Sequence, residues 1–147
     1  MWLLLQNRVW TADRLMLREW SNSYFCPMCY RNLETAKHLF AECPTTCSTW
    51  SAISSWSGCA SLHPDAWPKD VDLVTWFYEL AGSSTGVVAK GTRTLAILVM
   101  WTVWCERNGR IFNNQEKPVD NARLAALQLK STLVAIYYGY CDRTKRS

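Results

Sequence analysis

Residues 26–43 read CPMCYRNLETAKHLFAEC, and this stretch decides how the chain is interpreted. It places Cys26, Cys29, His38 and Cys43 in the pattern C-x2-C-x8-H-x4-C. Zinc takes four ligands in a tetrahedron, and three cysteines with one histidine are an established structural set. Two cysteines separated by two residues can both point inward from one tight turn, which Pro27 favours. The spacing therefore predicts a small zinc-stapled knuckle.

The predicted site is structural, because four protein ligands leave no open position for water or substrate. We expect one Zn²⁺. Three thiolates around the ion give a local charge of −1, which cancels the net +1 of residues 1–60. The knuckle itself is therefore expected to attract phosphate only weakly.

Two other interpretations of the cysteines stay open at this point. Free cysteines are among the most buried residues, so the four are also compatible with a plain core. A redox pair at Cys26 and Cys29 fits less well, because that motif normally accompanies a β-α-β pattern, which the sequence does not show. Cys47 is either a spare ligand or, as we expect, a core residue. The cysteines treated as structural are Cys59, Cys105 and Cys141.

Helix signals surround the knuckle and predict a mainly α fold. Residues 2–20 are expected to be helical, with Thr11 capping a second helix. Thr35 is predicted to cap a short helix, and Pro44 to begin the next one. No strand alternation persists long enough to predict a sheet. Further helices are predicted over residues 70–80, 92–107 and 118–138, the second of them ending at Asn108-Gly109.

Composition places the chain among globular proteins. Of its 147 residues 49% are hydrophobic and 19% charged, and nine are tryptophan, which excludes a chain built to be disordered. The most apolar run, residues 95–105, is shorter than the roughly 20 residues of a membrane span. The first residues lack the basic start and cleavage site of a signal peptide. With seven cysteines, we expect an intracellular protein of the nucleus or cytoplasm.

Positive charge is concentrated near the carboxyl end. The net charge of the chain is +4, and residues 94–147 carry eight Lys/Arg against four Asp/Glu. A basic tail is compatible with nucleic acid and equally with a solubilising terminus. The predicted nucleic-acid contacts are Arg18, Arg31, Lys37, Arg143, Lys145 and Arg146.

Aromatic side chains gather in sequence around the knuckle. Trp20, Tyr24, Phe25 and Tyr30 accompany two of the arginines, and such a mixture can stack on unpaired bases. The interpretation we favour is a hydrophobic cluster that shields the zinc. Arg107 and Arg110 are expected near a helix C-terminus, where the helix dipole stabilises cations without any ligand.

Several segments resemble a known family. Residues 11–15 (TADRL), 26–29 (CPMC) and 34–40 (ETAKHLF), with Cys43 and Trp50, resemble the zinc-binding domain of plant reverse transcriptases from LINE-type, non-LTR retrotransposons. Residues 101–108 (WTVWCERN) are similar to a stretch that follows this domain in the same plant sequences. The resemblance implies that the three cysteines and His38 bind zinc and that the domain contacts nucleic acid. It does not imply an enzyme, because the paired aspartates of a polymerase and the carboxylate set of ribonuclease H are absent from the sequence.

These observations predict three parts: a zinc-binding domain (residues 1–56), a linker with one short helix (57–91), and a separate C-terminal helical segment with a basic tail (92–147). The predicted function is that of a non-enzymatic, retrotransposon-derived zinc-binding module that binds RNA or DNA. The alternative is a protein-interaction module, or a non-functional retroelement remnant whose zinc site only supports folding. We expect neither a membrane nor a small-molecule substrate as partner.

Overall fold

The computed structural model describes residues 2–6, 8–81 and 86–113, and within these ranges the chain is mainly helical, as predicted. Residues 20–35 form an irregular loop, the cysteine loop, with a single antiparallel bridge between Phe25 and Leu33. In chain order the elements are α1 (Trp2–Leu5), α2 (Ala12–Met16), the π-helix η1 (His38–Glu42), α3 (Pro44–Ser57), the 3₁₀ turns η2 (Ala60–Leu62) and η3 (Pro64–Ala66), α4 (Leu73–Ala81) and α5 (Val87–Asn113).

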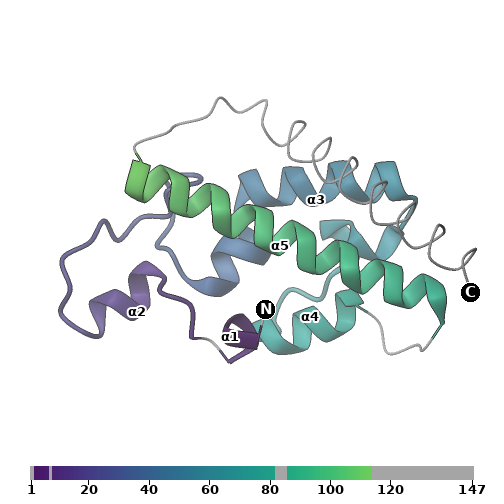
Figure 1. The fold of residues 1–147 in the computed structure, drawn as a ribbon, viewed down its shortest axis with the longest axis horizontal. Helices are drawn as coiled ribbons and strands as arrows, with labels where there is room; N and C mark the ends of the chain where they lie inside the picture. The colour runs from purple at the N-terminus through teal and green to yellow at the C-terminus, as the bar shows by residue number, and fades with distance from the viewer. Residues whose placement is uncertain (1, 7, 82–85, 114–147) are drawn as a thin grey trace, which may run out of the picture.

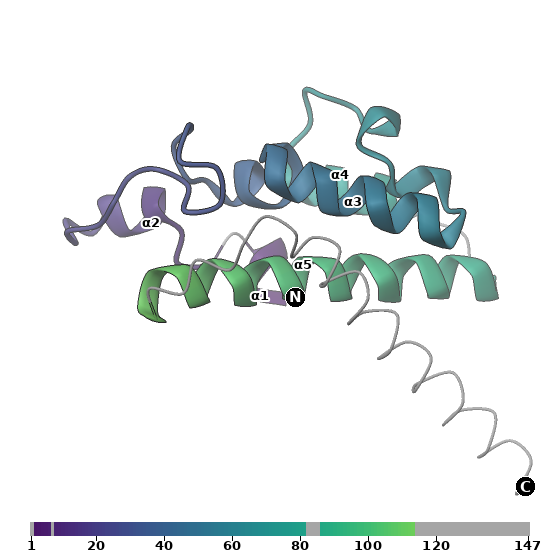
Figure 2. The same cartoon turned by 90° about the horizontal axis from the view of Figure 1, so that it is seen from above.

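Helix α5 runs along the length of the described structure and lies across the other long helices. It forms one layer, and α3 and α4 form the second, with α2 and the cysteine loop beyond one end (Figures 1 and 2). The face of α5 that meets α3 and α4 is apolar and buried at intervals of three and four residues. Its buried apolar positions include Leu95, Ala96, Val99, Met100 and Val103.

By length and composition alone, α5 is long and apolar enough to cross a membrane. The sequence-based expectation considered only residues 95–105, but the helix has 27 residues. Core helices of soluble proteins pass the same test. Here one face of α5 packs against α3 and α4, and 33% of its apolar window is buried in this way.

Two buried tryptophans of the core, Trp50 and Trp76, pack with a third, half-buried tryptophan. Trp50 of α3, Trp76 of α4 and Trp67 of the segment before α4 meet edge to face, with ring centroids 5.1–6.0 Å apart. Edge-to-face packing aligns the positive edge of one ring with the negative face of the next. The Trp50 indole N–H also donates to the Phe40 carbonyl at 2.9 Å, which ties α3 to the π-helix.

Residues 57–81 contribute directly to this core. Leu62 is fully buried, and α4 buries Leu73, Trp76, Phe77 and Leu80 in the cluster that also contains Trp50 and Cys43. Sequence alone suggested a linker because Gly58, Pro64 and Pro68 punctuate this stretch. In the structure these residues shape turns between packed elements, including the left-handed Gly58 that ends α3.

Local capping follows the sequence signals in part. The Thr35 hydroxyl accepts the backbone N–H of His38 at 3.0 Å, and Pro44 occupies the first turn of α3, both as predicted. Helix α4 begins at Leu73, because the Asp72 carboxylate accepts the N–H groups of Val74 and Thr75.

Two helix predictions need correction. Residues 2–20 do not form continuous helix, and the Thr11 hydroxyl donates to Asp13 at 2.6 Å without capping α2. Helix α5 begins at Val87 and continues through Asn108 and Gly109 to Asn113. A glycine costs a helix only about 1 kcal/mol, and tertiary contacts of residues on both sides of Gly109 offset this amount.

The predicted helix over residues 118–138 lies outside the described residues. Cys141 and the basic residues Arg143, Lys145 and Arg146 lie there as well.

Candidate zinc site

The first half of the site is a turn closed by backbone hydrogen bonds. The N–H of Tyr30 donates to the Cys26 carbonyl at 2.8 Å, and the N–H of Cys26 donates to the Asn32 carbonyl at 2.8 Å. Tyr30 has a φ of 55°, a left-handed conformation that costs an ordinary residue roughly 1–2 kcal/mol. This strained turn brings the Cys26 and Cys29 side chains to the same side.

The second half of the site is the π-helix. In an α-helix, residues five apart differ by about 140° around the axis and face different ways. Here the N–H of Cys43 donates to the His38 carbonyl at 2.6 Å, a bond that spans five residues and widens the turn. The H-x4-C spacing therefore suits a π-helix, and both side chains reach one point.

The structure brings together the four side chains that the spacing selects. The Cys26, Cys29 and Cys43 sulfurs and one ring nitrogen of His38 all lie within 4.8 Å of one another. The Cys26 and Cys43 sulfurs are 3.9 Å apart, and Cys29 Sγ lies 3.3 Å from His38 Nε2. A tetrahedral zinc with ordinary bond lengths needs about 3.8 Å between sulfurs and about 3.6 Å between sulfur and nitrogen. The donor set and its size both fit Zn²⁺.

Two of the thiols influence each other's protonation. The Cys26 thiol donates to Cys43, and this bond, aided by the backbone N–H groups of Thr46 and Thr45, lowers the pKa of Cys43 to about 5. The same hydrogen bond, together with burial, raises the pKa of Cys26. This hydrogen bond thus favours the thiolate form of Cys43 and the thiol form of Cys26.

Cys47 does not join this group. Its thiol donates to the Ala41 carbonyl at 3.3 Å, and burial raises its pKa. Among the described cysteines, Cys59 is half-buried near Thr92, and Cys105 is exposed. Cys47 is half-buried and satisfies its weak donor within the fold.

A buried ion pair connects the cysteine loop to α5. Arg107 donates to both carboxylate oxygens of Glu34, at 2.7 and 2.8 Å, and the two side chains are only 3% and 1% exposed. Arg107 also donates to the Trp10 carbonyl at 3.1 Å. Glu34 in turn accepts the N–H of Ala12, and so satisfies the N-terminus of α2. One charge pair therefore holds α2, the cysteine loop and α5 together.

A second arginine of α5 contacts the knuckle itself. Arg110 donates to the Pro27 carbonyl at 3.1 Å and pairs with Glu106 one turn earlier at 3.0 Å. The prediction that the helix dipole alone stabilises Arg107 and Arg110 is therefore wrong, because α5 continues past both residues and each has specific partners. Residues 34–40 and residues 101–108 are both stretches that resemble the plant sequences. They meet through the pairing of Glu34 with Arg107.

Sequence reasoning missed this pairing because its members are 73 residues apart. A usable signal existed: a lone arginine follows apolar residues 95, 96, 99, 100 and 103 on the same helical face. A cation on a buried face requires a buried partner.

Three of the six predicted nucleic-acid contacts lie in the described residues, and they are scattered over the structure. Lys37 is half-buried and pairs with Glu42 at 3.2 Å. Arg31 is exposed, and the Arg18 guanidinium lies 4.5 Å from the centre of the Trp10 ring. The aromatic residues Trp20, Tyr24, Phe25 and Tyr30 are all exposed, so the favoured interpretation of a cluster shielding the zinc is wrong.

The site defines a class of protein: a small helical domain organised by a buried cluster of three cysteines and one histidine. Residues 1–50 match a family model described as zinc-binding in reverse transcriptase, which confirms the resemblance over that part of the chain. An Arabidopsis thaliana protein named "Putative ribonuclease H protein" is 23% identical over 137 residues, which cover 93% of this chain and 20% of the relative. The chain thus spans about a fifth of that relative's length. No solved structure matches the chain.

Proposed function

We propose that this chain is a non-enzymatic module in which Cys26, Cys29, His38 and Cys43 hold one structural Zn²⁺ and which binds RNA or DNA. The observation that supports it most is the convergence of four ligand atoms within 4.8 Å. When bound, zinc supplies the positive charge that three neighbouring thiolates require. The chain's own residues orient these ligands through the Tyr30 turn and the π-helix.

A non-enzymatic role is supported by the chemistry of the ligand set. Four protein ligands complete the tetrahedron and leave no position for a water or a substrate. Cys26 and Cys43 are fully buried, and His38 is buried as well, which favours a closed site. The ribonuclease H named in the relative is attributed to a protein about five times longer, so it is not carried over to this chain.

Nucleic-acid binding is supported by the exposed aromatic and basic side chains around the knuckle. Trp20 is 59% exposed and lies beside the arginine-bearing helix α2. Stacking of bases on aromatic rings combined with phosphate contacts from cations is a common way to bind single strands. We further propose an intracellular location, because free cysteine thiols at the site require a reducing compartment.

Metal content of the purified chain tests the zinc proposal. We expect one zinc per chain, lost together with helical signal in Cys26→Ser and in His38→Ala. Cys47→Ser is the matched control, since Cys47 lies four residues after a proposed ligand but bonds to Ala41. The control should retain the metal. A chain that folds without zinc, or equal loss in the control, contradicts the proposal.

The salt dependence of oligonucleotide affinity tests the proposed binding of RNA or DNA. Affinity for an oligonucleotide must fall steeply with salt if phosphate contacts are made. No affinity in a zinc-loaded chain would instead favour a protein-interaction module, or a remnant whose zinc only supports folding.

A further inference from the structure

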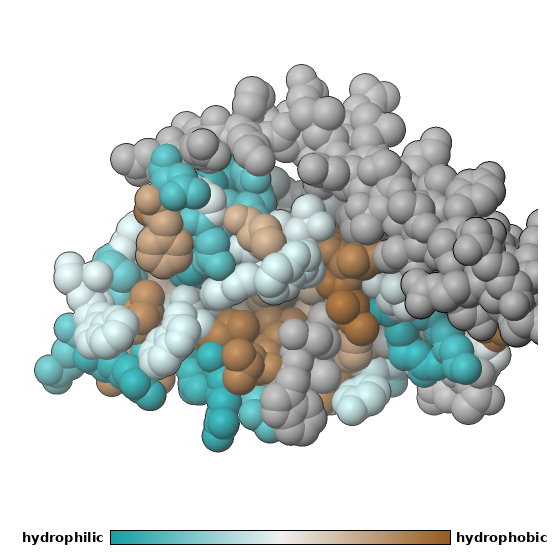
Figure 3. Space-filling view, viewed as in Figure 1, coloured by the Kyte–Doolittle hydropathy of each residue, from teal (hydrophilic) through white to brown (hydrophobic). Residues whose placement is uncertain are grey.

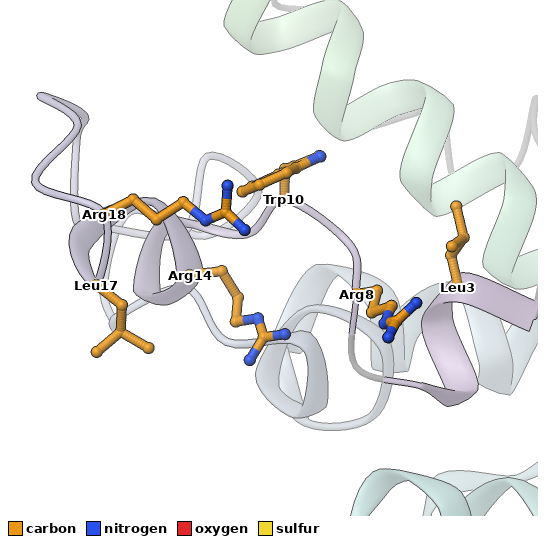
Figure 4. A pocket seen from close by; sticks show the side chains of 6 residues that line it. All are labelled: Leu3, Arg8, Trp10, Arg14, Leu17 and Arg18. Atoms are coloured by element: carbon orange, nitrogen blue, oxygen red, sulfur yellow. The ribbon is translucent and has the colours of Figure 1, made fainter.

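A cleft lined by three arginines lies between α1 and α2. It has a volume of 640 Å³ and is lined by Leu3, Arg8, Trp10, Arg14, Leu17 and Arg18. Figure 4 shows the Arg18 guanidinium, from the turn after α2, close to the Trp10 ring, Arg14 projecting from α2, and Arg8 extending from the segment after α1. Pockets of about 300–1,000 Å³ accommodate small organic groups such as a nucleotide.

The arginines of the cleft have two acidic neighbours in the chain, Asp13 and Glu19, but form no ion pair with either of them. None of the four ion pairs among described residues involves Arg8, Arg14 or Arg18. The nearby Glu34 carboxylate is already occupied by Arg107. Three guanidinium groups around one cleft repel each other. An anion that enters the cleft is attracted by all three. Phosphate groups fit guanidinium donors especially well.

An aromatic stack adjoins the cations. Trp10 and Trp20 lie nearly parallel, with an interplanar angle of 11° and centroids 5.9 Å apart, and both remain exposed. Figure 3 shows that apolar side chains gather in the middle of this face, while the α2 end carries hydrophilic and near-neutral side chains. A purely anionic ligand such as an acidic peptide makes no use of exposed indole rings, whereas a nucleobase does.

We propose that this cleft binds a single-stranded nucleic acid, with phosphates at Arg8, Arg14 and Arg18 and a base against the Trp10–Trp20 stack. The inference rests on the proposed function and assigns its binding to α2 and the segments on either side of it. The zinc knuckle then serves as a support: Glu34 accepts the N–H of Ala12 at 2.8 Å and so holds the first turn of α2 in place. Arg107 holds the Trp10 backbone through its carbonyl.

Fluorescence anisotropy with labelled 12-residue oligo(U) and oligo(dT), titrated with salt, tests the proposal on the zinc-loaded full chain. The test variant is Arg14→Gln/Arg18→Gln. The matched control is Lys69→Gln/Lys90→Gln, which removes the same charge from two exposed lysines. Lys90 lies in the first turn of α5, at the opposite end of the molecule from α2 (Figure 1). Zinc content and thermal unfolding are measured for every variant.

Each phosphate contact to a single strand contributes about −0.7 to the slope of log affinity against log salt. Loss of two contacts should flatten the slope by about 1.4 and weaken binding by about 25-fold at 0.1 M salt. The control should change affinity by less than about threefold. Trp10→Leu should weaken binding by at least about fivefold without changing the slope.

Several results would contradict the proposal that the cleft binds a single-stranded nucleic acid. These are equal weakening by the control, an unchanged affinity in the arginine variant, or equally tight binding of a duplex or of polyglutamate. If the wild-type chain binds the oligonucleotides and the cleft substitutions leave its affinity unchanged, the assignment of binding to the cleft is wrong while the proposed function stands. If the zinc-loaded wild-type chain binds no oligonucleotide, both fail. Tighter binding of one of the two oligonucleotides identifies the strand as RNA or DNA.

Discussion

Replacing Arg107 with methionine should destabilise the protein severely. The methionine side chain fills most of the space of the arginine stem, so the main effect of Arg107→Met is electrostatic. The Glu34 carboxylate would stay buried, at 1% exposure, with one remaining described partner, the N–H of Ala12. Removing one member of a buried ion pair costs about 3–5 kcal/mol, because the other charge is left without compensation.

Urea unfolding of the zinc-loaded chain measures this loss. With a slope of about 1.5 kcal/mol/M, a loss of about 4 kcal/mol lowers the midpoint by about 2–3 M. Arg110→Met is the matched control on the same helix. Arg110 is half-buried, pairs with Glu106 and contacts the Pro27 carbonyl, so its loss should cost about 1 kcal/mol.

A double variant separates charge from packing. Glu34→Gln keeps an oxygen that can accept the N–H of Ala12 and removes the charge. Glu34→Gln/Arg107→Met should therefore be more stable than Arg107→Met alone by at least about 1 kcal/mol. The reasoning is refuted if Arg107→Met costs less than about 1 kcal/mol, or if the two single losses simply add.

Three further predictions concern the metal, the glycines and one helix cap. Chelation of zinc should abolish part of the helical signal in circular dichroism, and added Zn²⁺ should restore it; an unchanged spectrum would show that the cysteine loop folds without metal. Gly109→Ala should raise the free energy of unfolding by about 0.5–1 kcal/mol, because Gly109 lies inside α5 with open space beside it, whereas Gly58→Ala, at φ 69°, should lower it by about 1 kcal/mol. The opposite sign at Gly109 would mean that α5 ends there. Hydrogen bonds from Thr75 and Val74 lower the pKa of Asp72, so its stabilising effect is complete above the ordinary value of 3.8 and disappears as pH falls through the lowered value. Asp72→Ala should therefore lower Tm at pH 7 and have no effect on Tm once the pH lies well below the lowered pKa of Asp72, as measured by thermal unfolding across pH.

The ligand cluster was predictable because its information is local. Four residues within 18 positions carry the chemistry, and their spacing alone limits which of them can meet. Capping by Thr35 and the start of α3 at Pro44 depend on one or two neighbouring residues, and the sequence predicted both correctly. Where a cap depended on a distant partner, as α2 depends on Glu34, the local prediction at Thr11 was wrong.

The extent of the core could not be read in the same way. Trp67 lies between Pro64 and Pro68 in a stretch that is typical of a linker, yet its ring packs against Trp50 and Trp76. Glycine and proline indicate where the chain turns, but they do not say whether the turning segment is covered by another element. Burial of α4 depends on α5, which follows it in the chain, whereas η2 packs against α3 and α4.

The sequence by itself determined the helical class, the four proposed zinc ligands and the reverse-transcriptase-type character of residues 1–50. All three follow from periodicity, spacing and short motifs. Only the tertiary structure decided that Glu34 and Arg107, 73 residues apart, join the knuckle to α5, and that Arg8, Arg14 and Arg18 surround one cleft. Such contacts depend on how helices pack, and packing is set by the whole buried surface, which no local pattern contains.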